Sequence, residues 1–420
     1  MFFLYTILYR IVLLFILPFE YIKRSAEIRK KWIREKFGFF DSSLFTPHAQ
    51  LFWIHAVSVG EVIAALPLLR KLREQYPSCT ILLSTITDTG QKVARERAPK
   101  GTWVIYLPFD IPSVLERALN TLNPGTLIIL ETELWPNLLR ACASRKIPVL
   151  LLNGRISENS YRGYRKVAFF MKKVLACVDF FGMQNEEYAA RIRSLGVEQR
   201  RVGNLGNFKF DAVLPHEPPA WTDRISHPVL VAGSTSEGEE GMITSAYLEL
   251  KNDFPGLTLV LAPRHPERFA EVGNFLKNGG IPLLKYSELS ALNSQPGTLK
   301  GVILLDTVGE LSGVYGAGDI AIIGKSFMGR GGQNPLEPAA WGKPILCGPH
   351  MENFPVIREF YEAGAALEVS PVNLPAAIRE LLMNPEKADA LGSRAREVYR
   401  KNSGAVERAM EVLAKYLEQC

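Results

Sequence analysis

The feature that most constrains the fold of this 420-residue chain is a regular alternation of short apolar runs with longer helical patterns. In the first half, strands are expected at residues 51–57, 80–85, 103–107, 126–130, 149–152 and 179–183. In the second half, they are expected at residues 229–232, 257–261, 302–305, 320–323 and 345–347. Because helical segments separate the strands, they should pair in parallel through right-handed crossovers. The sequence therefore predicts an α/β protein with two doubly wound, Rossmann-like domains that face a cleft.

A linker is predicted where the alternation lapses, at residues 211–228, a stretch that holds four prolines. It separates a first domain at 21–210 from a second domain at 229–420, whose closing helices can pack back on the first. A chain of this length exceeds the usual size of one compact core. Apolar residues make up 47% of the chain and charged residues 22%, which is typical of a globular protein. Five scattered cysteines form no close pair or ligand cluster, which fits a reducing compartment.

Residues 1–20 are predicted to be a membrane anchor, either spanning the bilayer or lying in its interface. Only Thr6 and Arg10 interrupt the apolar run that ends at Phe19, and as a helix this run would measure about 28 Å. Residues 1–40 carry eight Lys and Arg against three Glu, which accounts for +5 of the net charge of +6. That flank would bind anionic headgroups and keep the body cytoplasmic. A nucleic-acid binder would instead carry its charge on the folded body. The alternative is a buried first helix.

A glycine-rich loop at 329–342 follows the strand expected at 320–323 and leads into a helix. Asn334 is placed to cap this helix, with Pro335 and Leu336 in its first turn. Glycines let a ligand approach the backbone, and helix N–H groups attract anions. Glu337 could accept hydrogen bonds from ribose hydroxyls. The loop therefore favours a nucleotide site, although an ordinary strand–loop–helix turn would have the same pattern.

Three further polar loops follow strands of the second half, at 233–237, 262–268 and 306–310. Arg264 and His265 lie where a phosphate could bind, although a surface ion pair and a helix cap are their commoner roles. Four such loops at the carboxyl ends of parallel strands together predict a nucleotide pocket. The sequence lacks G-x-G-x-x-G after the first strand of either domain, the P-loop motif and D-x-D. We therefore expect no bound cofactor or metal, with N–H groups and basic side chains carrying the charge of a leaving nucleotide.

Two carboxylates of the first half follow strands and are candidates for acid–base chemistry. Glu61 opens the helix after the first strand, where the helix dipole would favour its ionised form, and Glu131 directly follows residues 126–130. Glu61 could equally be a first-turn residue that matches the dipole. Lys209 precedes the linker, within reach of both domains. A basic, aromatic stretch at 153–166 could hold a phosphorylated acceptor or could be a solvated helix face.

These segments resemble the 3-deoxy-D-manno-octulosonic acid (Kdo) transferases of Gram-negative lipopolysaccharide synthesis. The resemblance extends nearly end to end and is most specific in ETELWPN, APRHPERF and GGQNPLEP. It implies a GT-B fold, attachment to the cytoplasmic face of the inner membrane, CMP-Kdo as donor and lipid IVA as acceptor. It also implies inversion at the anomeric carbon without a metal. The number of sugars added, the linkages, the oligomeric state and any protein partners do not follow from it.

The resemblance also implies a role for each site residue. Glu61 would deprotonate the acceptor hydroxyl, and Glu131 and Lys209 would stabilise the transition state. The residues implied to bind CMP are Arg264, His265, Val308, Gly309, Glu310, Asn334, Pro335, Leu336 and Glu337. The chain departs from the family at Gly154, where alanine is common, and at Val308, where methionine is common. Specific acceptor contacts near residue 153 and a specific side-chain role for Val308 are therefore in doubt.

Two other functions remain open on the residues alone. One is a GT-B glycosyltransferase or an epimerase that uses a UDP-sugar, because the strand-end loops do not specify the nucleotide base. The other is a membrane-tethered nucleotide-binding protein without turnover, which would need neither Glu61 nor Glu131.

Overall fold

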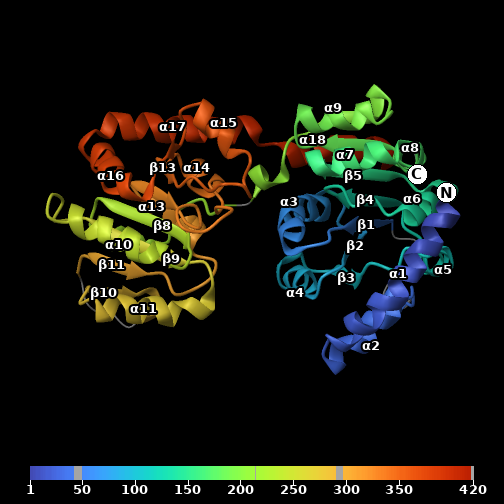
Figure 1. Cartoon of the computed structure of the whole chain (residues 1–420), viewed down its shortest axis with the longest axis horizontal. Coiled ribbons are helices and arrows are strands. Elements are labelled where there is room, and N and C mark those ends of the chain that lie inside the picture. Colours follow the sequence, from blue (N-terminus) through green and yellow to red (C-terminus); the bar gives the residue numbers. More distant parts are fainter. Residues whose placement is uncertain (42–49, 213, 290–296, 418–420) are drawn as a thin grey trace. The chain divides into compact units, whose positions relative to one another are not determined.

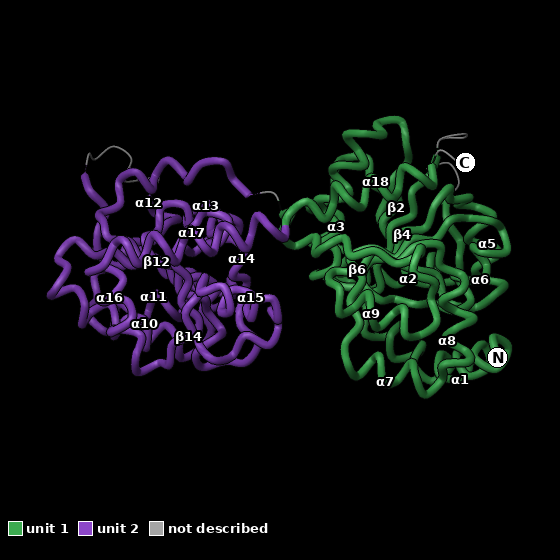
Figure 2. Tube along the Cα trace, turned by 90° about the horizontal axis from the view of Figure 1, so that it is seen from above, with its two compact units in different colours: residues 1–212, 403–420 green, residues 213–402 purple. Residues whose placement is uncertain are grey.

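The computed structural model describes residues 1–41, 50–212, 214–289 and 297–417, and the chain forms two compact units (Figures 1 and 2). Unit 1 holds the residues up to Ala212 together with the segment that begins at Ser403, and unit 2 holds Val213–Asn402. The sequence assigned that closing segment to the second domain, with the option of packing back on the first. In the structure, it belongs to unit 1.

Within the described residues, unit 1 contains a seven-stranded parallel sheet with the order β3-β2-β1-β4-β5-β6-β7. Its strands are β1 (Leu51–His55), β2 (Thr80–Thr85), β3 (Thr102–Tyr106), β4 (Thr126–Leu130), β5 (Val149–Gly154), β6 (Phe180–Met183) and β7 (Val202–Asn204). The strand order reverses between β1 and β4, the position where ligands bind in open α/β sheets. Six of these strands were predicted from the sequence.

Helices cover both faces of this sheet (Figure 1). They are α3 (Val59–Gln75), α4 (Asp88–Arg97), α5 (Pro112–Leu122), α6 (Pro136–Ser144), α7 (Glu158–Lys166), α8 (Ala168–Leu175), α9 (Glu186–Ser194) and α18 (Ala405–Leu417). The closing helix α18 buries Ala409, Met410 and Leu413 in the same apolar cluster as Leu68 of α3. The Asp211 carboxylate accepts the N–H groups of Gly404 and Val406, both at 2.6 Å, and so anchors the start of α18.

The N-terminal helix α1 (Phe2–Ile22) packs along unit 1 with one face and leaves the other exposed. Thr6 is buried and hydrogen-bonded to Asn137 of α6, and Leu13 and Leu17 contact an apolar cluster that contains Phe109. The opposite face exposes large apolar side chains of Phe3, Leu4, Leu8, Ile11, Leu14, Phe15 and Phe19. In the described part of the chain, α1 alone has the length and apolar composition of a membrane helix. A second helix, α2 (Ala26–Lys36), follows it.

Within the described residues, unit 2 repeats the architecture with a sheet in the order β10-β11-β9-β8-β12-β13-β14. Its strands are β8 (Val229–Thr235), β9 (Thr258–Pro263), β10 (Leu283–Lys285), β11 (Gly301–Leu304), β12 (Ile320–Ile323), β13 (Ile345–Cys347) and β14 (Leu367–Glu368). Here the order reverses between β8 and β12. All paired strands are parallel, so the loops that follow β8, β9, β11 and β12 lie at one edge of the sheet.

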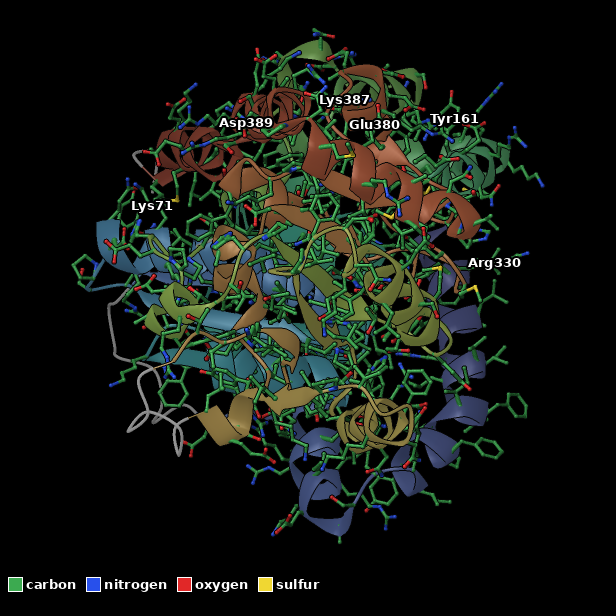
Figure 3. The ribbon with its side chains drawn as sticks, turned by 90° about the vertical axis from the view of Figure 1, so that its left-hand side faces the viewer. Lys71, Tyr161, Arg330, Glu380, Lys387 and Asp389 are labelled. Carbon is green, nitrogen blue, oxygen red and sulfur yellow. The ribbon has the colours of Figure 1, made fainter. Side chains whose placement is uncertain are left out.

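The helices of unit 2 pack on its sheet and on each other. They are α10 (Glu239–Leu250), α11 (Phe269–Asn278), α12 (Tyr286–Leu289), α13 (Leu311–Ala317), α14 (Leu336–Trp341), α15 (Ile357–Glu362), α16 (Leu374–Met383) and α17 (Pro385–Asn402). An ion pair between Glu380 and Lys387 joins α16 to α17 on the surface (Figure 3). The predicted linker contains a short 3-10 helix, Ala220–Arg224, and Trp221 packs against the unit 2 core. Its prolines therefore mark a folded segment of unit 2.

Candidate active site

Glu61 lies in the first turn of α3, directly beyond the carboxyl end of β1. Ser58 caps this helix: its Oγ accepts the Glu61 N–H at 3.5 Å and donates to the Glu61 carboxylate at 3.1 Å. The other carboxylate oxygen accepts the Val57 N–H at 2.8 Å. This reciprocal arrangement is a variant of the capping box, with the Val57 N–H in place of the N–H of the N-cap residue Ser58, and it holds the carboxylate in place. Glu61 therefore also has the structural role that the sequence left open.

The protonation of Glu61 differs from the sequence-based expectation. Its side chain is buried, and burial raises the pKa of Glu61 to about 7, with smaller upward contributions from Glu131 and Glu133. The hydrogen bond from Val57 lowers it by less. The expectation that the helix start favours the ionised form is therefore wrong in its net effect, because desolvation outweighs the helix dipole. A carboxyl group with a pKa near neutrality is suited to act as a general base.

Glu131 directly follows β4, the strand next to β1. Its backbone φ is +55°, a left-handed conformation that is uncommon for a residue with a side chain. The Glu131 N–H donates to the Leu152 carbonyl at 3.1 Å, and the Thr132 hydroxyl donates to the Arg155 carbonyl. These bonds to the neighbouring strand end hold Glu131 in its strained conformation, which is a feature found repeatedly at functional sites.

Lys209 lies in the short 3-10 helix that follows β7. The carboxylates of Glu61 and Glu131 shift its pKa. Burial lowers the pKa of Lys209, while the charges of Glu131 and Glu61 raise it and that of Arg155 lowers it further. Charges interact this way only at short range in a partly desolvated site. The structure thus brings Glu61, Glu131 and Lys209 together from three separate strand ends, as the sequence predicted for a shared site.

Asn153 supports this cluster and was not recognised as a site residue from the sequence. It is fully buried with φ at +54°, and its Oδ1 accepts the Phe208 N–H at 3.1 Å. This bond fixes the backbone immediately before Lys209. The sequence alone could not single out Asn153, because an Asn after a strand is common. Its left-handed conformation and its burial, which only the structure shows, identify its role.

In unit 2, the sequence-predicted nucleotide residues lie on loops at one sheet edge. Arg264 follows β9 and is exposed together with His265, whose Nδ1 is 3.8 Å from Glu267. Burial raises the pKa of Glu337, and the charge of Arg264 partly offsets this rise. Arg264 and Glu337 are therefore neighbours, although they come from the loops after β9 and β12.

The loop at 334–337 differs in detail from its prediction. Asn334 caps as expected, because its Oδ1 accepts the Leu336 N–H at 3.0 Å, and its Nδ2 donates to Glu337 at 3.2 Å. However, α14 has only six residues. Such a short helix has a small dipole, so side chains rather than the helix start must provide most of the ligand attraction here.

The loop at 308–310 lies at the same sheet edge, after β11. Val308 is 66% exposed, and Gly309 has φ at +111°, a conformation that suits glycine. Glu310 is the N-cap residue of α13, and its carboxylate raises the pKa of the nearby Tyr286 after the larger contribution of burial. The residues of this loop thus line the edge with the exposed apolar group of Val308, the left-handed glycine Gly309 and the carboxylate of Glu310.

The loop at 233–237 does not offer the anion site that its sequence suggested. The buried Glu239 carboxylate accepts the N–H groups of Ser236 at 2.9 Å, Lys325 at 2.6 Å and Phe327 at 2.9 Å. It therefore occupies the donors of this loop and of the loop after β12. The sequence did not distinguish Glu239 from its neighbours Glu237 and Glu240. The group that accepts these N–H donors is thus the Glu239 carboxylate and not a bound phosphate.

Among the residues that the structure describes, no group of three His, Cys, Asp or Glu side chains is placed to hold a metal ion. Two parallel-sheet units, with carboxylates at the switch point of one and nucleotide-type loops at the edge of the other, define the GT-B class of two-domain glycosyltransferases and epimerases. Similar solved structures share this fold. A UDP-GlcNAc 2-epimerase from Neisseria meningitidis bound to UDP-GlcNAc has a TM-score of 0.58 at 13% identity, covering 87% of this chain and 100% of its own.

The sequence comparisons define the family. The family model described as 3-deoxy-D-manno-octulosonic-acid transferase (kdotransferase) matches residues 31–212. The 3-deoxy-D-manno-octulosonic acid transferase of Haemophilus influenzae is 35% identical over 405 residues, covering 94% of this chain and 93% of the relative. That of Bordetella pertussis is 34% identical over 397 residues, covering 91% of each. The chain belongs to the Kdo transferase family, which confirms the resemblance drawn from its motifs.

Proposed function

We propose that this enzyme transfers Kdo from CMP-Kdo to lipid IVA with inversion, in lipopolysaccharide synthesis at the cytoplasmic face of the inner membrane. The observation that supports this most strongly is the charged cluster of unit 1, in which Glu61, Glu131 and Lys209 act on one another. Its only member with a pKa raised to about 7 is Glu61, which would accept the proton of the acceptor hydroxyl. Lys209 and Glu131 would stabilise the charge that develops during transfer.

Unit 2 would hold the donor through its strand-end loops. Arg264 and His265 would contact the phosphate, and Glu337 would accept hydrogen bonds from the ribose. The backbone at Val308 to Glu310, together with the turn from Asn334 to Leu336, would complete the CMP contacts. No metal or other cofactor is required by this scheme, because the leaving phosphate is paired with side chains.

The experiment that tests the function is mass spectrometry of lipid IVA after incubation with the protein and CMP-Kdo. We expect one or more mass increments of a Kdo residue, which also counts the sugars added. Parallel incubations contain UDP-sugars in place of CMP-Kdo. Product with a UDP-sugar alone would replace the proposal by the UDP-sugar alternative, and no product with any donor would favour a nucleotide-binding protein without turnover.

Replacing Arg264 by Ala should weaken CMP binding by about 1.5–3 kcal/mol, the loss of one charged hydrogen bond. Because Arg264 is exposed, its removal should not unfold unit 2. Calorimetric titration with CMP measures the effect. Lys277→Ala removes an exposed charge from the last turn of α11 and is the matched control. Equal CMP affinity of the Arg264 and Lys277 variants would exclude Arg264 from the nucleotide site.

Membrane attachment would occur through α1 in the plane of the interface rather than across the bilayer. The support is its packing: Thr6, Leu13 and Leu17 face unit 1, whereas Phe15 and Phe19 are exposed. A helix held along its length by the protein has one face left for lipid, as in interfacial anchors. Phe15→Ser with Phe19→Ser should therefore shift the protein from vesicles to supernatant in flotation assays, without loss of the fold. Unchanged flotation would contradict attachment through this face.

A further inference from the structure

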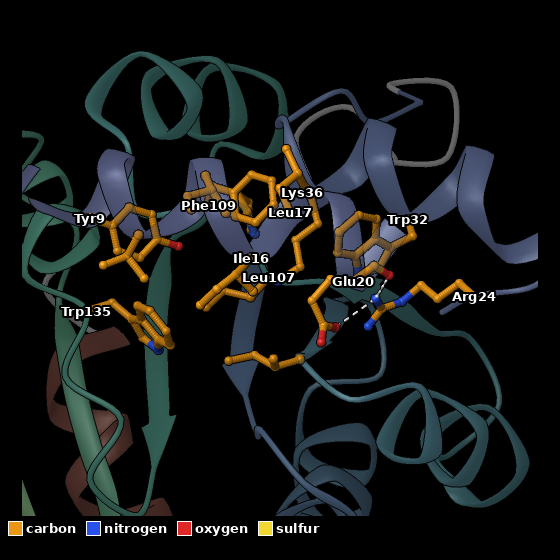
Figure 4. A pocket seen from close by; sticks show the side chains of 14 residues that line it. Tyr9, Ile16, Leu17, Glu20, Arg24, Trp32, Lys36, Leu107, Phe109 and Trp135 are labelled. Carbon is orange, nitrogen blue, oxygen red and sulfur yellow. Dashed lines mark hydrogen bonds and ion pairs between the residues drawn. The ribbon is translucent and has the colours of Figure 1, made fainter. Parts of the chain in front are cut away.

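A pocket of about 360 Å³ lies in unit 1 between α1, α2 and the loops that follow β2, β3 and β4 (Figure 4). One wall is apolar and is formed by Leu13, Ile16 and Leu17 of α1, with Leu107 and Phe109 opposite. The wall provided by α1 continues into the exposed apolar face of that helix, where Ile16 is 48% exposed. An alkyl chain from a bilayer could therefore enter along α1.

The other end of the pocket is basic. Arg24 pairs with Glu20 at 2.9 Å and with Asp88 at 3.0 Å, so its charge is compensated. Lys36 is different: it is 7% exposed, and its ammonium lies 5.3 Å from the centre of the Phe109 ring. Among the described residues, no hydrogen bond or ion pair holds the Lys36 amine, although the charges of Glu20, Asp88 and Glu35 act on it. Burying an ammonium group without a partner is costly, so Lys36 is a site for an anionic group.

The protonation of Lys36 agrees with this assignment. Burial, with a smaller contribution from Arg24, lowers the pKa of Lys36 to about 7, and the charges of Glu20, Asp88 and Glu35 only partly offset this. A bound phosphate would add negative charge next to the amine and favour the ammonium form. The pocket thus offers an apolar wall for a chain and a cation for a phosphate within a single enclosure.

Two residues that line the pocket lie near the candidate catalytic site. Ile86 lines the pocket, and the Ile86 N–H donates to the Val57 carbonyl at 3.3 Å, while the Val57 N–H donates to Glu61 at 2.8 Å. Trp135 lines it as well, four residues after Glu131. A ligand in the pocket would therefore lie at the same edge of the sheet as both carboxylates.

We propose that this pocket binds the acceptor lipid, with one acyl chain against the α1 wall and a phosphate group at Lys36. This inference rests on the proposed function, since it takes the acceptor to be a phosphorylated, acylated sugar. The acceptor carries all three groups that this region could bind: an alkyl chain for the α1 wall, a phosphate for Lys36, and a hydroxyl that reacts near Glu61. A glycerophospholipid of the bilayer has the first two only, so its binding would give no role to the proximity of Glu61.

Fluorescence quenching tests occupancy without requiring turnover, because Trp32 and Trp135 line the pocket. Acceptor lipid with brominated acyl chains, presented in detergent micelles, should quench the protein, and Trp135→Phe combined with Trp32→Phe should remove most of that effect. Brominated phosphatidylglycerol should quench little, and unlabelled acceptor should displace it. Equal quenching by both lipids without displacement would show a structural phospholipid and overturn the proposal. Absence of quenching by the acceptor would overturn it as well.

Lys36→Met retains the length and apolar stem of the side chain but removes the ammonium. We expect the KM for the acceptor to rise about ten- to a hundredfold, because one charged hydrogen bond is lost. The KM for CMP-Kdo should stay unchanged. Lys36→Arg should preserve most of the affinity, which separates loss of charge from misfolding. Lys23→Met, at an exposed position one turn beyond Glu20, is the matched control.

These outcomes separate the pocket from the reaction. Quenching by the acceptor without Kdo transfer would leave the pocket in place and remove the proposed function. Transfer with an unchanged acceptor KM in Lys36→Met would leave the function in place and remove the pocket.

Discussion

Glu61→Gln is expected to lower the rate of Kdo transfer by about 10²–10⁴-fold, the contribution typical of a general base, while CMP binding stays nearly unchanged. The amide oxygen can still accept the Val57 N–H, so the start of α3 should keep its conformation. What the variant loses is the basic oxygen. Single-turnover transfer with CMP-Kdo and lipid IVA measures the rate, and calorimetric titration with CMP measures the donor side. Near-normal turnover would be fatal to the assignment of Glu61 as the base.

Two further readouts make this test specific. Because a base must be ionised, kcat/KM of the parent enzyme should fall about tenfold per pH unit below the Glu61 pKa of about 7, and this dependence should be absent from the residual activity of Glu61→Gln. The raised pKa also affects stability. The folded state binds the Glu61 proton more tightly than the unfolded state, so stability decreases as pH rises from the unfolded pKa towards about 7. Above pH 7, Glu61→Gln should therefore unfold at an equal or higher temperature.

The alternation of apolar runs predicted most of the fold because most of these runs are strands buried on both faces. Residues 126–130 and 320–323 are examples, in which every side chain of β4 and β12 is buried. The strands that were missed, β7, β10 and β14, have three, three and two residues and lie towards the sheet edges. They are too short to show a periodic pattern, and their pairing depends on neighbours that are distant in sequence.

Helix boundaries show the same dependence on tertiary context. The segment between β5 and β6 forms two helices, α7 and α8, because the backbone leaves the helical conformation at Val167, with φ at −118° and ψ at 32°. Neither proline nor glycine marks this break. The return of α18 to unit 1 is likewise set by a partner nearly two hundred positions earlier in the chain, Asp211.

The candidate site was predictable in its residues but less so in its electrostatics. Glu61 and Glu131 were identified because parallel topology places successive strand ends at one edge. The raised pKa of Glu61 was not predicted, since it depends on burial and on the proximity of Glu131 and Glu133. Lys36 could not have been identified at all, because its sequence context is an ordinary amphipathic helix, and only the packing of α1 and α2 encloses it.

Glu239 is the residue for which sequence and structure differ most. The run from Ser236 to Glu240 contains three acidic residues, and the sequence gives no reason to expect a particular one to be buried. In the structure, Glu239 and Glu240 are both buried, and Glu240 pairs with Arg268 at 2.6 Å, whereas Glu237 is exposed. Glu239 joins the loops after β8 and β12, the two strands at which the order of the sheet reverses. Its carboxylate therefore determines how these loops are held at the donor edge.

We expect Glu239→Ala to destabilise unit 2 by about 3 kcal/mol or more. The substitution leaves the N–H groups of Ser236, Lys325 and Phe327 without their acceptor, and each unsatisfied buried donor costs about 1–3 kcal/mol. Glu239→Gln should be intermediate, because one amide oxygen remains to accept these bonds. Glu237→Ala removes a similar carboxylate from the exposed surface and should change little.

Two measurements separate this effect from a general loss of fold. Hydrogen exchange should accelerate in Glu239→Ala at the loops 233–238 and 324–328 first, since their N–H groups lose the shared acceptor. CMP affinity should fall in parallel, because these loops adjoin the residues proposed to bind the nucleotide, while the core strands of unit 1 keep their protection.

If Glu239→Ala matched Glu237→Ala in unfolding temperature and loop exchange, the loops would have to be held by their glycine conformations alone. Gly324 and Gly348, where an added Cβ would lie 2.3 Å and 2.1 Å from backbone carbonyl oxygens, would then determine their positions.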